Sequence, residues 1–316
     1  MNRKAVAACL LALVILAGCG TKQPASQKQA AAKPKIALVM KSLANEFFKT
    51  MEDGARKHNA EHASEYELIC NGIKDEQDVG KQIDVVQQMI AQGVDAIVLA
   101  PADSKALVSA CKQAQKAGIV VVNIDNKLDA AALKEAGLQI PFVGPDNRKG
   151  AKMAAEVLAK KLKPGDKVAI IEGAPNAYNG IQRKLGFEDA IRGAKANIVT
   201  SQSGVWELDK ANKVASGILA KYPDIKALLC ANDNMALGAL AAVRGAGKAG
   251  KVDVVGFDNI SAANELVQNG QLLSTVDQHA DKLAIYGIEY ALKMIKDSSA
   301  PKDQETPVDL ITAEKK

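Results

Sequence analysis

Cysteine is scarce in this 316-residue chain, with five residues and no recurring spacing. Two of the five, Cys9 and Cys19, belong to the N-terminal segment. The other three stand far apart in apolar runs, at Cys70, Cys111 and Cys230. An odd number at such spacings fits neither a disulfide framework nor a zinc site. We therefore expect three buried free thiols.

An excess of charge is also missing. The formal net charge is +5, and it falls by two, to +3, if a signal peptide carrying Arg3 and Lys4 is removed. This value is too small to indicate a nucleic-acid partner or an acidic one. No strand-like segment is followed by a Gly-x-Gly-x-x-Gly turn or a phosphate-binding Gly-Lys-Ser/Thr loop. We expect no cofactor, no metal and no nucleic acid.

The N-terminus has the pattern of an exported lipoprotein. Two cations precede an apolar run of roughly 12 residues, whereas a membrane span needs about 20. The run ends in the lipobox Leu16-Ala-Gly-Cys19. We predict a signal peptide over residues 1–18, acylation of Cys19, and a flexible tether over residues 19–34. The protein would be exported to the periplasm or the cell surface and held to the membrane by its lipid alone.

From Lys35 onward, short apolar runs alternate with longer stretches of helical period. Alternation of this kind indicates parallel strands that are covered by helices on both faces. The predicted strands are Ile36–Met40, Tyr66–Cys70, Ala96–Ala100, Ile119–Ile124, Val168–Ile171, Ile198–Ser201, Ala227–Ala231 and Val252–Phe257. The predicted helices include Asn45–Asn59, Asp78–Gln92, Ser104–Ala117, Lys149–Lys161 and Asn179–Gly193. We expect two sets of four or five strands, with Leu272–Val276 and Val308–Ile311 crossing between them.

An internal repeat supports the division into two sets. Ala96-Ile-Val-Leu-Ala-Pro-Ala-Asp103 is matched by Ala227-Leu-Leu-Cys-Ala-Asn-Asp-Asn234, at an offset of 131 residues. Val122-Asn-Ile-Asp125 is matched by Val255-Gly-Phe-Asp258, at an offset of 133 residues. A repeat this long predicts two similar doubly wound α/β domains. The chain is expected to pass from one to the other near residues 142–147, where Gly-Pro breaks an apolar run.

We therefore predict an α/β fold of two similar doubly wound parallel-sheet lobes joined by a three-segment hinge. The N-terminal lobe would comprise residues 35–145 and 279–303. The C-terminal lobe would comprise residues 146–278 and 304–316. The hinge segments would lie near residue 144, near residue 278 and within residues 301–307.

Polar residues gather where ligands bind to open parallel sheets, which is beyond the carboxyl ends of the strands. They are Lys41, Asp103 and Asp125 in the first lobe and Glu172, Asn232, Asp233 and Asp258 in the second. If the lobes face each other, the opposed polar groups are Lys41, Asn45 and Asp125 against Arg183, Asn232 and Asp258. Apolar walls are available from Phe47, Phe48 and Trp206. Carboxylates accept hydrogen bonds, cations donate them and amides do both, so this set predicts a sugar or polyol site.

Several motifs in a fixed order resemble the periplasmic pentose- and hexose-binding proteins. They are Ile36-Ala-Leu-Val-Met-Lys-Ser-Leu-Ala-Asn-Glu-Phe-Phe48, Val121-Val-Asn-Ile-Asp125, Val168-Ala-Ile-Ile-Glu-Gly173, Arg183-Lys-Leu-Gly-Phe187, Cys230-Ala-Asn-Asp-Asn-Met-Ala-Leu-Gly238 and Val254-Val-Gly-Phe-Asp258. Each motif is loose alone, but their order and spacing together are highly specific, and the resemblance covers nearly the whole mature chain. The resemblance implies the periplasmic binding protein-like I fold. It also implies ligand contacts at Lys41, Asn45, Phe47, Phe48, Asp125, Arg183, Trp206, Asn232, Asp258 and Gln278.

Within that family the chain is most similar to the allose-binding type. Lys41 stands where ribose binders carry Ser, and the segment after Asp125 has the longer form of the allose type. Departures are Asn126 in place of the Arg of ribose binders, Glu46 in place of a usual Pro, and Phe48 where the allose type has Trp. The resemblance disfavours ribose and leaves an allose-like hexose, a pentose or an open-chain polyol as the ligand.

The resemblance implies a monomeric solute-binding subunit of an ABC sugar importer. Such a protein closes its lobes around one monosaccharide and delivers it to a permease and its ATPase, because contacts from both lobes stabilise the shut state. The alternative is a sensor that presents a sugar or polyol to a membrane chemoreceptor. Both would use the same closure.

Two catalytic interpretations compete with ligand binding. The segment His58-Asn-Ala-Glu-His62 matches an inverted zinc-peptidase motif, but a third ligand is needed and the remaining histidine is His279. We expect the pair to mark a solvated helix end. Asp125 and Asp258 could serve as the acid and base of a secreted carbohydrate-active enzyme. Neighbouring cations and amides are expected to keep both ionised, which favours binding, so no enzyme is predicted.

A sugar-responsive transcription regulator of the same fold is the last alternative. Such a regulator needs a helix-turn-helix before its first lobe. In this chain the apolar leader occupies that place.

Overall fold

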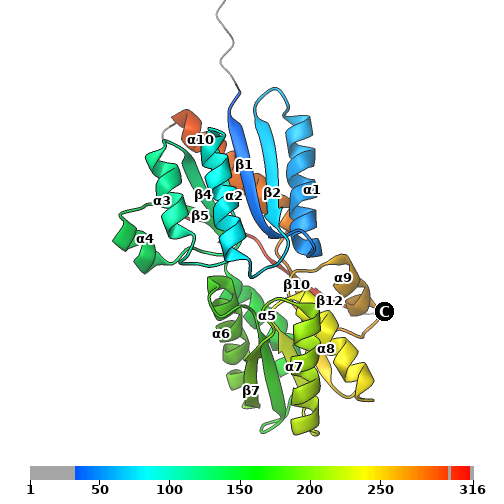
Figure 1. Cartoon of the computed structure of the whole chain (residues 1–316). Helices are drawn as coiled ribbons and strands as arrows, with labels where there is room; N and C mark the ends of the chain where they lie inside the picture. Colours follow the sequence, from blue (N-terminus) through cyan, green and yellow to red (C-terminus); the bar gives the residue numbers. More distant parts are fainter. Residues whose placement is uncertain (1–32, 298–299, 314–316) are drawn as a thin grey trace, which may run out of the picture. The chain divides into compact units, whose positions relative to one another are not determined.

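The computed structural model describes residues 33–297 and 300–313. The predicted signal peptide, the predicted lipid site Cys19 and residues 19–32 of the predicted tether lie outside these ranges. Among the described helices, none is both long and apolar enough to cross a membrane. The described residues form two α/β lobes, each built on one sheet (Figure 1).

The first sheet has its strands parallel, in the order β11-β5-β4-β3-β1-β2. These strands are β1 (Lys35–Ser42), β2 (Glu67–Ile73), β3 (Ala96–Leu99), β4 (Val120–Ile124), β5 (Phe142–Pro145) and β11 (Gln304–Thr306). One face is covered by α2 (Val79–Ala91) and α3 (Val108–Lys116), with α4 (Ala130–Ala136) packed beside α3. The other face is covered by α1 (Glu46–Glu61) and α10 (Ala280–Asp297) (Figure 1).

The second sheet has the order β12-β10-β9-β8-β6-β7, with β12 antiparallel to β10. Its strands are β6 (Lys167–Glu172), β7 (Asn197–Ser203), β8 (Ala227–Cys230), β9 (Asp253–Val255), β10 (Ser274–Asp277) and β12 (Asp309–Thr312). One face carries α5 (Asn147–Ala159) and α6 (Tyr178–Gly193). The opposite face carries α7 (Leu208–Lys221), α8 (Asp233–Gly245) and α9 (Ser261–Gln268).

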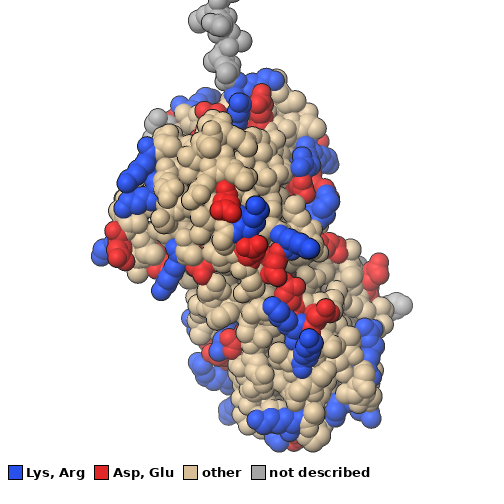
Figure 2. Space-filling view, viewed as in Figure 1, with Lys and Arg blue, Asp and Glu red and all other residues tan. Residues whose placement is uncertain are grey.

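Burial follows the position of each strand in its sheet. Every residue of the central strands β3 and β8 is buried, because helices cover them on both faces. The edge strands β2 and β7 are mostly half-buried. On the face seen in Figure 2, positive and negative side chains alternate over both lobes, in keeping with the small net charge.

The prediction of two doubly wound lobes is confirmed, with differences in the strands. Each sheet contains six described strands rather than four or five. The segments Leu272–Val276 and Val308–Ile311 were expected to cross between lobes, and this is wrong. They overlap β10 and β12, which pair with each other in the second sheet. Pairing gives partners to backbone groups that would otherwise be buried without hydrogen bonds.

The predicted end of the N-terminal lobe at residue 303 is three residues too early. Gln304–Thr306 pairs in parallel with β5 and so belongs to the first sheet. These three residues are polar and carry no hydrophobic pattern, so the sequence did not reveal the strand. The three peptides that cross between the sheets are Asp146, residues 278–279 and residues 307–308.

The expectation of three buried thiols is wrong for one of them. Cys111 and Cys230 are buried and free, whereas Cys70 is free but partly exposed. Cys70 lies in β2, and an edge strand has no neighbour on one side to cover it.

Candidate functional site

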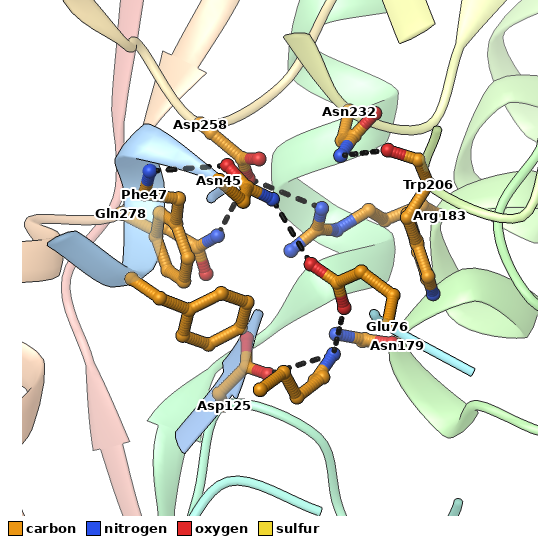
Figure 3. A pocket seen from close by; sticks show the side chains of 12 residues that line it. Asn45, Phe47, Glu76, Asp125, Asn179, Arg183, Trp206, Asn232, Asp258 and Gln278 are labelled. Carbon is orange, nitrogen blue, oxygen red and sulfur yellow. Dashed lines mark hydrogen bonds and ion pairs between the residues drawn. The ribbon is translucent and has the colours of Figure 1, made fainter. Parts of the chain in front are cut away.

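Residues of both lobes line one cavity (Figure 3). All ten predicted ligand residues line it: Lys41, Asn45, Phe47, Phe48, Asp125, Arg183, Trp206, Asn232, Asp258 and Gln278. Glu76 and Asn179 complete the lining.

Three lining residues have backbone conformations that non-glycine residues rarely adopt. Asp125 follows β4 with a φ of 60°, Asp258 follows β9 with a φ of 122°, and Trp206 precedes α7 with a φ of 72°. Positive φ costs on the order of 1–3 kcal/mol per residue and persists only where the surroundings hold it. With these backbone conformations, the side chains of the three residues line the cavity at the ends of regular elements.

In the first lobe, one cation lies between two carboxylates. The Nζ atom of Lys41, at the end of β1, is 3.1 Å from Asp125 Oδ2 and 3.8 Å from Glu76 Oε2. All three side chains are almost fully buried. The amide of Asn45 donates to Glu76 Oε1 at 3.1 Å, while its oxygen caps α1 by accepting from the N–H of Phe47. The helix cap therefore also positions the carboxylate.

In the second lobe, Arg183 and Asp258 form a buried ion pair with an Nη1–Oδ1 distance of 3.2 Å. The same oxygen of Asp258 accepts from Gln278 Nε2 at 2.7 Å. Arg183 also donates to Asn147 Oδ1 at 2.8 Å and to the carbonyl of Ala231 at 2.9 Å. Because three further groups form hydrogen bonds with this pair, its orientation is strongly determined.

Aromatic side chains form the apolar part of the lining. Phe47 and Phe48 pack edge to face, with centroids 5.1 Å apart, and Lys41 Nζ lies 5.3 Å from the ring centroid of Phe48. The Trp206 ring lies 5.5 Å from Lys41 Nζ and 5.6 Å from Arg183 Cζ. A Cβ atom at Gly173 would come within 2.1 Å of that ring, so only glycine allows the indole to lie there.

Polar atoms without partners collect in this cavity. Five buried side-chain N or O atoms of the described residues have no hydrogen-bond partner, and four of them line the cavity: Glu76 Oε2, Asp125 Oδ2, Trp206 Nε1 and Gln278 Oε1. The two carboxylate oxygens keep their ion pairs with Lys41, but without hydrogen-bond geometry. Leaving such a group unsatisfied costs about 1–3 kcal/mol. These atoms offer three acceptors and one donor to a ligand.

Burial shifts the protonation of two lining carboxylates. It raises the pKa of Glu76 to about 7, although Lys41 and the Asn45 hydrogen bond pull that pKa down. It also raises the pKa of Asp258 well above its usual value, against the opposing effect of Arg183. We expected the neighbouring cations to lower the pKa of Asp258 and so keep it ionised. The pKa shift has the opposite direction, because the loss of hydration on burial outweighs the attraction of Arg183.

Hydrogen bonds outside the cavity also join the lobes. Asn176, between β6 and α6, donates to Asp103 Oδ2 at 2.6 Å, and its carbonyl accepts from the N–H of Ser104. On another side, Glu46 Oε1 accepts from the N–H of Ser261 at the start of α9, at 2.7 Å. These contacts hold the lobes together beside the cavity.

Asn126, which stands where ribose binders carry Arg, takes part in the same closure. It is fully buried and donates to the carbonyl of Pro101 at 2.9 Å. Its Oδ1 accepts from the N–H of Asn179 in the other lobe at 3.2 Å. Asn126 does not line the cavity.

The rule of strand ends found four of the twelve lining residues, Lys41, Asp125, Asn232 and Asp258, and it was not selective. Asp103, Glu172 and Asp233 follow strands as predicted, yet none of them lines the cavity. Glu172 instead pairs with Lys184 at 2.8 Å. The rule also missed Glu76, which lies just beyond β2 and could have been found by it. Asn179 in the first turn of α6 has no comparable signal.

The two neighbouring histidines do not form a metal site. Among residues 33–297 and 300–313, no three His, Cys, Asp or Glu side chains are grouped to hold a metal ion. His58 and His62 stack with centroids 4.3 Å apart, and their Nδ1 atoms contact Tyr66 Oη and Glu65 Oε1, both at 2.9 Å. The side chain of His58 is 11% exposed and that of His62 is 40% exposed, while residues 60, 61 and 63–65 around them are exposed, so the helix end is solvated as expected.

We predict that Glu76→Gln reduces the pH dependence of stability. A carboxyl whose pKa is raised on folding stabilises the protein fully below its unfolded value near 4.5, and this stabilisation is lost as the pH rises through about 7. The melting temperature of the ligand-free protein should therefore fall between pH 5 and pH 8, and fall less for the variant. Calorimetry measures the melting temperatures of the wild type and of the variant across this pH range, with the exposed Glu61→Gln on α1 as control. Parallel profiles for Glu76→Gln and the wild type would contradict this assignment.

Comparison with known proteins gives a consistent result. The family model described as periplasmic binding protein domain matches residues 36–299. The D-ribose/D-allose-binding protein of Pseudomonas aeruginosa is 54% identical over 310 residues, which is 96% of this chain and 97% of that protein.

Two solved structures are similar over nearly the whole described chain. An ABC transporter solute-binding protein from Burkholderia multivorans, with an unknown ligand represented as α-D-erythrofuranose, has a TM-score of 0.87 and 57% identity, over 89% of this chain and 100% of that one. A periplasmic solute-binding protein from Actinobacillus succinogenes with bound D-allose has a TM-score of 0.84 and 40% identity, over 89% and 98%. With its two lobes, its enclosed polar cavity and these matches, the chain belongs to the family of periplasmic binding protein domains.

Proposed function

We propose that this protein binds one monosaccharide between its lobes and delivers it to an ABC importer. The observation that carries the proposal is the cavity itself, where buried donors and acceptors from both lobes surround a small volume with aromatic walls. The ligand contacts would be the ten residues predicted from the sequence together with Glu76 and Asn179. The protein would bind its ligand without chemical change, in line with relatives that are named as sugar-binding and solute-binding proteins.

The chemistry of the lining suits sugar hydroxyls. A hydroxyl both donates and accepts, so it can satisfy the free oxygens of Glu76 and Asp125 and the free N–H of Trp206. The cations Lys41 and Arg183 donate. Hydrogen bonds to charged groups contribute about 1.5–3 kcal/mol each, so an inverted or missing hydroxyl would leave a buried charge unpaired.

An allose-like hexose and a ribose-like pentose are the ligands we favour. One similar structure contains D-allose, and the relative from Pseudomonas aeruginosa is named for both D-ribose and D-allose. The sequence resemblance disfavoured ribose because of Lys41. Because that relative is named for both sugars, we keep ribose as a candidate ligand.

We further propose that the protein works as an exported monomer. The sequence of residues 1–19 favours removal of a signal peptide and anchoring through Cys19. The lobes would comprise residues 35–145 with 279–306, and residues 146–278 with 307–316, and they would rotate about the three crossing peptides. The closed form would then dock on a permease with its ATPase.

We predict that Asp258→Ala abolishes sugar binding while the fold persists. The change removes the acceptor that orients Arg183 and Gln278, and it leaves the arginine buried without its carboxylate. Titration calorimetry with D-allose and D-ribose measures the loss, and circular dichroism checks the fold. The matched control is Glu172→Gln, another carboxylate at a strand end, which should bind normally because it does not line the cavity. Unchanged affinity in Asp258→Ala would rule out the site.

A sugar screen of the purified chain should identify a ligand by its effect on stability. A ligand that binds only the folded state stabilises it by about 2.7 kcal/mol at a hundredfold excess over its Kd. We expect melting-temperature increases with D-allose or D-ribose and none with their open-chain alditols, which must lose more conformational freedom on binding. If only the alditols raise the melting temperature, the ligand is an open-chain polyol and the proposal of a monosaccharide is wrong.

We expect Glu46→Ala to weaken sugar binding about threefold although Glu46 lies outside the cavity. The change removes the bond to Ser261 that joins the lobes, and so disfavours closure. Asp53→Ala on the same helix breaks an exposed ion pair with Lys49 within one lobe and should leave affinity unchanged. Equal affinities for both variants and the wild type would show that this bond does not contribute to closure.

A further inference from the structure

Asp233 is a buried carboxylate that does not line the cavity. Its side chain, in the first turn of α8, is fully inaccessible to solvent. Its partners include the hydroxyl of Thr275, at 2.8 and 3.0 Å, and the backbone N–H of Ile260, at 3.1 Å, with the backbone N–H groups of Phe257 and Asn259 also acting on it. None of these partners is a cation, and burial raises the pKa of Asp233 to about 6. Burying a carboxylate without a cation costs free energy, so we expect Asp233 to have a structural or functional role.

The partners of Asp233 hold the turn that carries Asp258. This turn, residues 256–260, leads from β9 to α9 and contains two consecutive non-glycine residues with positive φ, 122° at Asp258 and 56° at Asn259. The hydroxyl of Thr275 accepts from the N–H of Asn259 at 3.2 Å while it donates to Asp233. The two N–H groups that follow Asp258 are thus bound by the hydroxyl and the carboxylate.

The start of the same turn lies against the carboxylate. A Cβ atom at Gly256 would come within 2.1 Å of Asp233 Oδ1. Glycine at this position lets the chain pass the carboxylate at close range. Asp233 therefore contacts the turn both before and after Asp258.

We propose that Asp233 and Thr275 form a buried clamp that positions Asp258 for ligand binding without contacting the ligand. This inference rests on the proposed function, in which Asp258 is a ligand contact. The clamp offsets the strain of the turn in the ligand-free protein, so that Asp258 meets Arg183 and Gln278 before a sugar arrives. Asp233 is thus a positioning residue, and its effect on affinity should pass through Asp258.

The test uses Thr275→Val, which removes the hydroxyl and keeps the shape of the side chain. With D-allose and D-ribose as probes and the full chain in mild detergent, calorimetry should show binding weakened about tenfold. Thr275→Ser keeps the hydroxyl and should retain affinity within about twofold. Ser274→Ala is the matched control, because it removes a buried hydroxyl that bonds to Ala154 instead of the turn. It should lower the melting temperature and leave the Kd unchanged.

A double-mutant cycle separates positioning from general stability. In an Asp258→Asn background, where binding is weaker but measurable, Thr275→Val should change the Kd by less than about twofold. Its effect on the melting temperature should be the same in both backgrounds. If the two substitutions multiply their effects on the Kd, or if Thr275→Val alone leaves it unchanged, the clamp is overturned.

Failure of the proposed function gives a different result. If the wild type binds neither probe, sugar binding by these ligands is wrong, and the clamp is then judged by crystal structures of the wild type and Thr275→Val. A displaced turn at residues 256–260, with Asp258 moved away from Arg183, would support the clamp. An unmoved turn would refute it.

Discussion

Burial of opposite charges between two lobes is the constraint on which the site depends. Lys41 and Arg183 are the cations of the lining, and both are almost fully removed from water. A buried ion is tolerated only when its partners are held in place, because its hydration has been lost. The helix cap at Asn45 and the strained turns at Asp125 and Asp258 are the local features that hold them.

The balance of these charges bears on the kind of ligand that fits. Three carboxylates, those of Glu76, Asp125 and Asp258, face two cations, so full ionisation would leave an uncompensated negative charge in a dry cavity. Burial raises the pKa of both Glu76 and Asp258, which opposes full ionisation of the site. Because excess charge is costly in a buried cavity, such a lining favours a neutral ligand with many hydroxyls over an anion.

Most of the fold and the lining could be predicted from the sequence because both depend on local patterns. Continuous apolar runs indicated the central strands, and the rule of strand ends located Lys41, Asp125 and Asp258, while Gln278 came from the family resemblance alone. The strand at residues 304–306 was not predicted, because it forms by pairing with β5, which is distant in the sequence. Asp103 lies at a strand end like Asp125 but bonds Asn176 in the other lobe, and such partners depend on how the lobes meet.

The pattern of hydrogen bonds indicates how closure and binding are coupled. Within the first lobe Lys41 pairs with Asp125 and Glu76, and within the second Arg183 pairs with Asp258. Among the described residues, no hydrogen bond or ion pair between two side chains of the lining joins one lobe to the other (Figure 3).

Each half of the cavity is therefore organised by its own lobe, and the task left to a ligand is to bridge them. Gln278 lies on a crossing peptide and Asn147 directly follows another, yet both bond to the pair formed by Arg183 and Asp258. Because this pair is tied to two of the three crossings, the proposed rotation about the hinge would carry the second half of the site as one unit. The free energy of binding then depends on how well one small molecule satisfies both halves at once.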